Sequence, residues 1–308
     1  MALASAAGMM TDGFEFALGP PSTGFSIFLA KRTIKVHFIS VSEGKHNVAV
    51  RRIIRDRIEG TDSHEAVRIA TNEAEVSLLR EDGVDVSAHH LHDARLSRRG
   101  RKQASALKEL LAKRPSGGRP FTAFDLVVTS PLTRACETAQ IVFGDTPGTY
   151  GGEVISPPRI VVREECRERF GKYVCDSRRT GTLLQEEFPS FDFTSFDADA
   201  DILHGDERES FVDVQDRALR LLQWLSARPE RCVAVVTHSE LLTHLFGQFG
   251  DTLHEEDRTM LQRTAVNCEL RSVVLCSHQP VERESNDAPA STIRVPSCSS
   301  VSSLTSLS

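Results

Sequence analysis

The stretch KVHFISVSEGKHNVA, residues 35–49, joins an apolar run to a polar turn and then to a segment with helical spacing. Residues 33–41 are rich in β-branched side chains, which is typical of a strand buried on both faces. After Gly44, apolar residues recur at helical spacing as far as Ile58. A buried strand that feeds a helix through a short turn indicates an α/β fold, and ligands bind at such turns.

Strands and helices continue to alternate along the chain. Apolar runs predict further strands over 124–130, 159–165, 231–239 and, at an edge of the sheet, 267–278. Helical patterns fill 96–114, 131–144, 211–229 and 240–249, with Ser97 as a cap, Pro131 in a first turn and Gly144 after a last turn. Residues 175–210 are predicted to be rich in loops. The alternation predicts a three-layer α/β/α domain with a mainly parallel central sheet.

The composition limits the partners. The 308 residues carry a formal net charge of -6, so no global basic field favours nucleic acid. No apolar run reaches the ~20 residues that a transmembrane helix needs, so we expect no membrane partner either. We expect the domain to span 33–276. Residues 1–32 are predicted to be a disordered N-terminal extension, and the Ser-rich residues 277–308 a disordered tail.

The cysteines favour a reducing compartment. None of the seven forms a CxxC pair, and several lie in apolar runs, as buried thiols do. We expect a cytoplasmic protein, and an organellar leader within 1–32 stays open. The three histidines of AHHLHDAR (88–95) lack further ligands at a recognisable spacing. We therefore expect a polar loop there, with no metal site and no cofactor.

Polar side chains follow four of the predicted strands. They are Ser40 and Ser42 around Val41, the segment Ser130–Arg134, Glu165 with Glu168, and His238. Because the carboxyl ends of parallel strands meet at one edge of a sheet, we expect these side chains to converge there.

Five motifs in order resemble the histidine phosphatase superfamily, in its phosphoglycerate-mutase-like branch, over roughly residues 33–276. They are DARLSRRGRKQA (93–104), TSPLTRACETA (129–139), ECRERFGKYVCDSR (165–178), GDERESFVDVQDRALRLL (205–222) and VAVVTHSELL (233–242). The resemblance implies a phosphohistidine mechanism, in which Arg134 and His238 hold the phosphoryl group. It implies an acid that protonates the leaving group, at Glu165 or Glu168, and favours Glu168.

The first motif departs from the family pattern. The residues of EGKHN (43–47) keep the family register, which places Ser40 at the family's arginine and Val41 at its nucleophilic histidine. Valine has no lone pair with which to attack phosphorus, and serine lacks the charged fork that clamps a phosphate.

Resemblance and departure together predict a protein that has lost covalent phosphoryl transfer and keeps a phosphate-ligand pocket or an interaction role. The predicted remnants are His238 and Glu168 from the catalytic set, and Arg134, Asn47, His238 and Ser40 from the phosphate-binding set. The alternative is an active phosphatase or mutase on phosphomonoesters, with a site rebuilt around His238 and Arg134. In that case Ser40 or Ser42 would attack with His238 as base, or His238 itself would attack.

The expected ligand is a phosphorylated small molecule or a phosphoprotein. A protein partner is also expected to bind the acidic segment 185–209 or the Ser-rich tail. A purely structural interaction protein is the third interpretation, and it predicts no phosphate binding.

Overall fold

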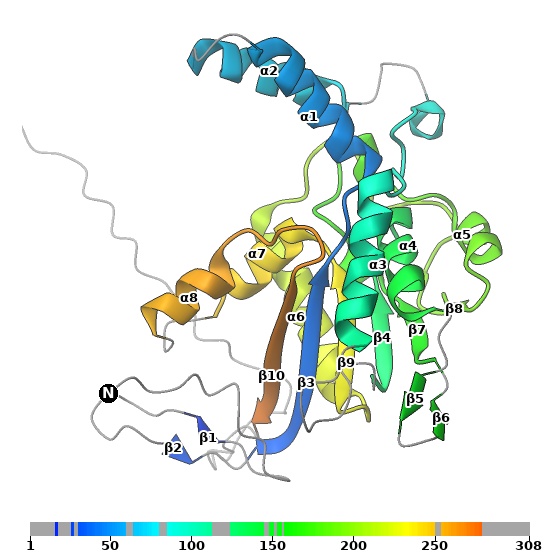
Figure 1. Ribbon diagram of the computed structural model, residues 1–308, viewed down its shortest axis with the longest axis vertical. Coiled ribbons are helices and arrows are strands. Elements are labelled where there is room, and N and C mark those ends of the chain that lie inside the picture. Colours follow the sequence, from blue (N-terminus) through cyan, green and yellow to red (C-terminus); the bar gives the residue numbers. More distant parts are fainter. Residues whose placement is uncertain are drawn as a thin grey trace, which may run out of the picture. The chain divides into compact units, whose positions relative to one another are not determined.

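The computed structural model describes residues 16–17, 26–27, 30–59, 64–79, 85–112, 124–144, 148–150, 153–155, 157–249 and 254–278 (Figure 1). The chain divides into Thr33–Leu275 and a second unit formed by Met1–Arg32 with Cys276–Ser308. In the second unit, β1 (Phe16–Ala17) pairs antiparallel with β2 (Ser26–Ile27). The predictions of disorder for 1–32 and 277–308 otherwise lie outside the described residues.

A six-stranded sheet forms the centre of the larger unit. Its order is β10 (Leu270–His278), β3 (Ala30–Ser40), β9 (Cys232–Thr237), β4 (Leu126–Thr129), β7 (Arg159–Val162) and β8 (Phe191–Asp192). The strands from β3 to β8 pair in parallel. β10 runs antiparallel to β3. The Ser40 N–H donates to the Glu269 carbonyl (3.0 Å) and His37 lies against Ser272 (2.7 Å), so residue numbers fall along β3 as they rise along β10. The mainly parallel sheet and the edge position of its last strand are confirmed.

Helices cover both faces of this sheet, which confirms the three-layer architecture (Figure 1). On one face, α3 (Arg98–Ala112), α4 (Thr133–Phe143) and α5 (Gly181–Glu187) pack on side chains such as Ala234 and Val236. On the other face, α6 (Phe211–Ala227) and α7 (Ser239–Gly247) pack on Val233 and Val235. Because both faces are buried, successive residues of β9 are apolar without alternation.

The remaining elements surround this core. They are α1 (Lys45–Ile58), α2 (His64–Val76), α8 (Glu255–Gln262), the short strands β5 (Gly148–Tyr150) and β6 (Glu153–Ile155), and the 3₁₀ turns Val86–Ala88, Glu164–Cys166 and Val174–Asp176. Figure 1 shows α1 and α2 side by side at one end of the larger unit.

Two details of the predicted helices are confirmed and one is wrong. The Ser97 hydroxyl accepts the Gly100 N–H (2.9 Å) and caps α3, and Gly144 follows the last turn of α4. Helix α4 begins at Thr133 after the N-cap Leu132, so Pro131 precedes the helix instead of lying in its first turn. The segment predicted to be rich in loops consists mostly of loops, and it also contains α5, a helix of seven residues that is too short to show a periodic pattern.

Among the cysteines that the structure describes, Cys136, Cys166 and Cys175 are buried. In the described part of the chain, no helix is long and apolar enough to cross a membrane. The same residues contain no group of three or more histidine, cysteine or acidic side chains placed to hold a metal ion.

Candidate functional site

A cavity of about 250 Å³ opens at the carboxyl ends of β3 and β9. It is lined by Ser40, Val41, His46, Asn47, Arg134, Glu168, His238, Ser239, Ala265, Val266 and Asn267. The list includes every residue that the sequence assigned to the remnant site and the valine at the nucleophile position. The structure therefore brings at least one residue from each of the four predicted strand ends into one cavity, as parallel pairing favours.

The wall contributed by β3 has little charge of its own. Val41 is 8% exposed and packs in the apolar layer between the sheet and α3 and α4, so its alkyl side chain serves both core and cavity. Its N–H donates to the Thr237 carbonyl (2.8 Å) and its carbonyl accepts from the Asn267 amide (3.0 Å). The Asn47 side chain accepts the Gly44 N–H (2.9 Å), which closes the turn into α1.

Arg134 is the buried cation of the cavity. One terminal nitrogen donates to the Cys175 carbonyl (2.6 Å) and the other to the Asp176 carboxylate (2.8 Å). Asp176 also accepts from Arg208 (2.7 Å). Burial would raise the pKa of Asp176, but the two arginines outweigh it and the pKa is lowered, so the carboxylate is ionised. These contacts use two of the five N–H bonds of the Arg134 guanidinium.

The carboxyl groups of Glu168 and Glu165 lie in different surroundings. Glu168 lines the cavity, and burial together with the nearby Asp176 and Glu240 raises its pKa to about 7. Glu165 forms an ion pair with Arg163 away from the cavity. Of the two glutamates, Glu168 is the one that lines the cavity, and a pKa of about 7 leaves part of it protonated near neutral pH.

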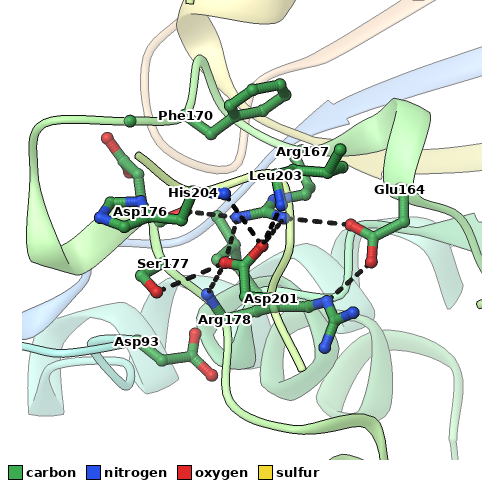
Figure 2. A network of polar contacts seen from close by, with 12 residues as sticks. Asp93, Glu164, Arg167, Phe170, Asp176, Ser177, Arg178, Asp201, Leu203 and His204 are labelled. Atoms are coloured by element: carbon green, nitrogen blue, oxygen red, sulfur yellow. Dashed lines mark hydrogen bonds and ion pairs between the residues drawn. The ribbon is translucent and has the colours of Figure 1, made fainter. Parts of the chain in front are cut away.

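A buried ion network holds the segment that carries Glu168 and Asp176 (Figure 2). At its centre, the Asp201 carboxylate accepts two hydrogen bonds from Arg167 (2.8 Å each) and one from the Arg178 N–H (2.8 Å). Arg167 is fully buried, and it also donates to the Asp176 carbonyl (2.8 Å). The network therefore fixes the residue before Glu168 and the partner of Arg134 at the same time.

Two neutral histidines face the cavity. Burial and the nearby Arg134 lower the pKa of His46 to about 3, and the same causes lower the pKa of His238 well below its ordinary value. His238 Nε2 bonds to the Ser130 hydroxyl (2.9 Å), so the expected pairing of His238 with Ser40 or Ser42 is not formed in this structure. Nδ1 is buried without a hydrogen-bond partner in both rings.

Three nearby polar side chains lie outside the cavity lining. Ser42, the alternative attacking group, is buried, with its hydroxyl 2.8 Å from the Cys268 sulfur. His37 is buried within β3 against Ser272. Lys45 is exposed at the start of α1.

The acidic segment 185–209, predicted as a partner surface, uses much of its charge internally. Glu187 pairs with Arg95 and Arg179, and Asp192 pairs with Arg159. Asp199 accepts the Thr182 N–H (2.7 Å) at the start of α5, and Asp201 belongs to the buried network.

Sequence reasoning missed several contributors to the site. Asp176 was visible only as part of the CDSR motif, and its pairing with Arg134 spans 42 positions. Ser130 and Asn267 carried no sequence signal for their roles. The chain turns sharply after Asn267, where Cys268 has a φ of 59° and donates its N–H to the Ser40 carbonyl (3.0 Å).

The fold and the cavity define an α/β/α protein with a polar site at the carboxyl edge of a parallel sheet. The chain belongs to the histidine phosphatase superfamily (branch 1), which matches residues 83–288, about two thirds of its length. The matched range does not include the stretch 35–49.

Similar proteins include two from a plant and a bacterial phosphatase of known structure. Phosphoglycerate mutase-like protein 2 of Arabidopsis thaliana is 30% identical over 300 residues, which cover 83% of this chain and 77% of that protein. Phosphoglycerate mutase-like protein 1 of the same plant is 29% identical over 218 residues, covering 65% and 76%. The crystal structure of the α-ribazole phosphatase from Shigella flexneri has a TM-score of 0.42 and 18% identity, covering 78% of this chain and 89% of that chain.

Proposed function

We propose that this protein has lost the covalent phosphoryl-transfer reaction of its superfamily and retains a pocket that binds a phosphate-bearing ligand. The observation that carries the proposal is the position of Val41. Its alkyl side chain lines the cavity at the end of β3, where the family resemblance implies the nucleophilic histidine. An alkyl group forms no bond to phosphorus, and removing a nucleophile has cost about 10⁶-fold in rate in another covalent enzyme.

The altered neighbour supports the same conclusion. Ser40 replaces the arginine that the resemblance implies, so one of the cations that would spread charge in the transition state is missing. His46 and His238 are neutral and do not replace that charge. Arg134 is then the cation closest to any bound phosphate, and Asp176 balances it.

Binding without chemistry remains compatible with the cavity. Arg134 has N–H bonds to spare, Asn47 and Asn267 offer amides, and Ser40 and Ser239 offer hydroxyls. A cavity of about 250 Å³ accommodates a phosphate group with part of the molecule that carries it. The protonated fraction of Glu168 can donate a hydrogen bond to a phosphate oxygen, because its pKa is about 7.

Hydrolysis of an aryl phosphate by the purified protein tests the loss of chemistry. We expect no activity in the natural protein and measurable activity in Val41→His or in Ser40→Arg with Val41→His. Orthophosphate is expected to raise the melting temperature relative to chloride at equal ionic strength. Hydrolysis by the natural protein that disappears in His238→Ala would contradict the proposal.

An active phosphatase with a rebuilt site is the second candidate, and one observation favours it. The neutral imidazole of His46 lines the same cavity as Arg134 and Glu168. A neutral imidazole has the lone pair that a nucleophile needs. This candidate predicts a phosphorylated protein that survives alkali, decays in acid and is absent in His46→Ala.

A further inference from the structure

An arginine-lined cleft continues from the cavity along α1. A hollow of about 470 Å³ shares His46, Asn47 and Asn267 with the cavity wall. Its other wall includes Arg51 and Arg99, which also line an adjoining hollow of about 640 Å³. We call these two hollows the arginine cleft.

The hollow of about 640 Å³, which we call the outer hollow of the arginine cleft, is strongly cationic. Its lining contains one acid, Glu43, and five arginines: Arg51, Arg52, Arg55, Arg98 and Arg99. The chain as a whole carries a net charge of -6, so this concentration is local. Such a surface attracts anions by its summed field.

The five arginines are not equally neutralised. Arg51 forms an ion pair with Glu43, and Asp56 lies 3.5 Å from Arg52 and 2.8 Å from Arg55. Arg99 has only a 3.9 Å approach to Glu43. Arg98 is exposed, and no ion pair involves it within the described residues. Arg98 and Arg99 therefore have the most charge to offer an anion.

The placement of these two arginines is unfavourable without a ligand. Gly44 bridges to Leu96, and the Ser97 N–H donates to the Glu43 carbonyl (2.9 Å), so the N-termini of α1 and α3 lie together. Neither helix has an acid in its first turn, and α3 begins with Arg98 and Arg99. Cations at a helix N-terminus oppose the helix dipole, and a bound anion would relieve this.

The cleft has a length that suits a second charged group. Asn47, Arg51 and Arg55 are spaced by one turn of α1, so the arginines lie on the order of 6 and 12 Å along the helix from the cavity wall. The wall between cavity and cleft includes His46, whose buried Nδ1 has no partner.

We propose that the ligand is polyanionic, with one phosphate in the cavity beside Arg134 and a second phosphate-type group in the arginine cleft near Arg98 and Arg99. This inference deepens the proposed function and depends on it for the first of the two subsites. The second subsite recognises charge and spacing, so the expected ligand class is a compact molecule with two or more phosphate groups.

Calorimetric titration with inorganic tripolyphosphate and with orthophosphate tests the second subsite. We expect the natural protein to bind tripolyphosphate about tenfold more tightly, since a charge-assisted contact is worth about one decade of affinity. Arg98→Gln with Arg99→Gln should remove this tenfold advantage and change orthophosphate affinity less than about twofold. Both side chains are exposed, so the double variant should melt no lower than the natural protein.

Two control variants separate the outcomes. Arg220→Gln with Arg231→Gln removes the same charge from exposed positions outside the arginine cleft, and we expect it to retain the tripolyphosphate advantage. Equal losses in the two double variants would reduce the effect to long-range charge and overturn the inference. Val266→Trp, an exposed residue at the cavity, should weaken both ligands. If Val266→Trp left tripolyphosphate binding unchanged, the ligand would lie in the arginine cleft alone, and this result would also overturn the inference.

The inference and the proposed function fail in different ways. If both ligands bind equally and neither responds to Arg98→Gln with Arg99→Gln, the second subsite is overturned and the phosphate pocket stands. If neither ligand binds the natural protein, both are overturned.

Discussion

Two segments face the same cavity and differ in how their residues are held. The turn from β3 into α1 carries Ser40 and Val41, at positions where the family resemblance implies a charged clamp and a nucleophile. The segment from Glu164 to Glu209 carries Glu168 and Asp176, and it is held by the buried ion pairs of Asp176 with Arg134, Asp201 with Arg167 and Glu164 with Arg178. The reacting group and the framework that positions it are thus separate parts of the molecule.

The difference has a physical reason. A valine at position 41 packs in the apolar layer, so folding does not require a polar side chain there. Asp201 is the bidentate partner of the fully buried Arg167, whose other acidic contact is Glu164 at 3.2 Å, so a change at Asp201 would leave a buried charge poorly compensated. Under the proposed function, chemistry is lost from one wall while folding preserves the other.

The largest expected effect comes from removing the Asp201 carboxylate from the buried ion network. Asp201→Ala should lower the free energy of unfolding by about 3–5 kcal/mol, because the buried Arg167 loses its bidentate partner and keeps only the 3.2 Å contact with Glu164. Urea denaturation measures this, with Asp197→Ala as the control. Asp197 is exposed, and its replacement should change the free energy by less than about 0.5 kcal/mol. Equal effects from the two variants would mean that the network contributes little to stability.

The second-largest expected effect is a pH-dependent change in stability at Glu168, the acid of the cavity. Burial, Asp176 and Glu240 raise the pKa of Glu168 from 4.5 to about 7. The native state then holds a proton that the unfolded state releases between these values, so stability falls as pH rises through this window. Glu168→Gln removes the ionisation and should stabilise the protein at pH 8 by about 2–3 kcal/mol, and hardly at all at pH 4.

The matched control for this prediction lies three residues away. Glu165→Gln alters a partly exposed carboxylate that pairs with Arg163, and it should change stability by less than about 1 kcal/mol at either pH. Melting curves of both variants across this pH range decide the matter. A gain for Glu168→Gln that is the same at pH 4 and pH 8 would refute the raised pKa.

The sequence predicted the parts that depend on local pattern and chain order. Apolar runs located the main strands, and parallel pairing then placed Asn47, Arg134, Glu168 and His238 at one cavity. The family register also drew attention to Val41, which lies where the resemblance implies the nucleophile. These features follow from the periodicity of buried residues and from motif spacing.

Features that depend on tertiary distance were not predictable. The pairing of Arg134 with Asp176, and of His238 with Ser130, joins residues that no periodicity relates. Helix α8 has the polar sequence EEDRTMLQ and no buried residue, so it lacks the apolar stripe by which helices are recognised. The arginine cleft likewise forms only where the starts of α1 and α3 meet.

The smallest effect concerns the wall with the altered motif. The Ser97 hydroxyl caps α3 and also donates to the buried Glu43. Ser97→Ala should cost about 1–2 kcal/mol in the free energy of unfolding, because both hydrogen bonds are lost. Although burial alone would raise the pKa of Glu43, Ser97 and Arg51 lower it, so the Glu43 contribution is present above pH 4.5 and is lost as pH falls further.

The pH dependence distinguishes the two roles of Ser97. If the hydroxyl stabilises ionised Glu43, the cost of Ser97→Ala should shrink in acid by the part that Glu43 contributes, and the capping part should remain. Ser105→Ala on the same helix is the control, since its exposed hydroxyl bonds only to the Arg101 carbonyl and its removal should be neutral within about 0.5 kcal/mol. A cost for Ser97→Ala that stays constant with pH would assign the whole effect to the cap. It would also mean that the turn after Val41 is held by backbone hydrogen bonds to Arg95 and Ser97, and that the Glu43 carboxylate does not help to hold it.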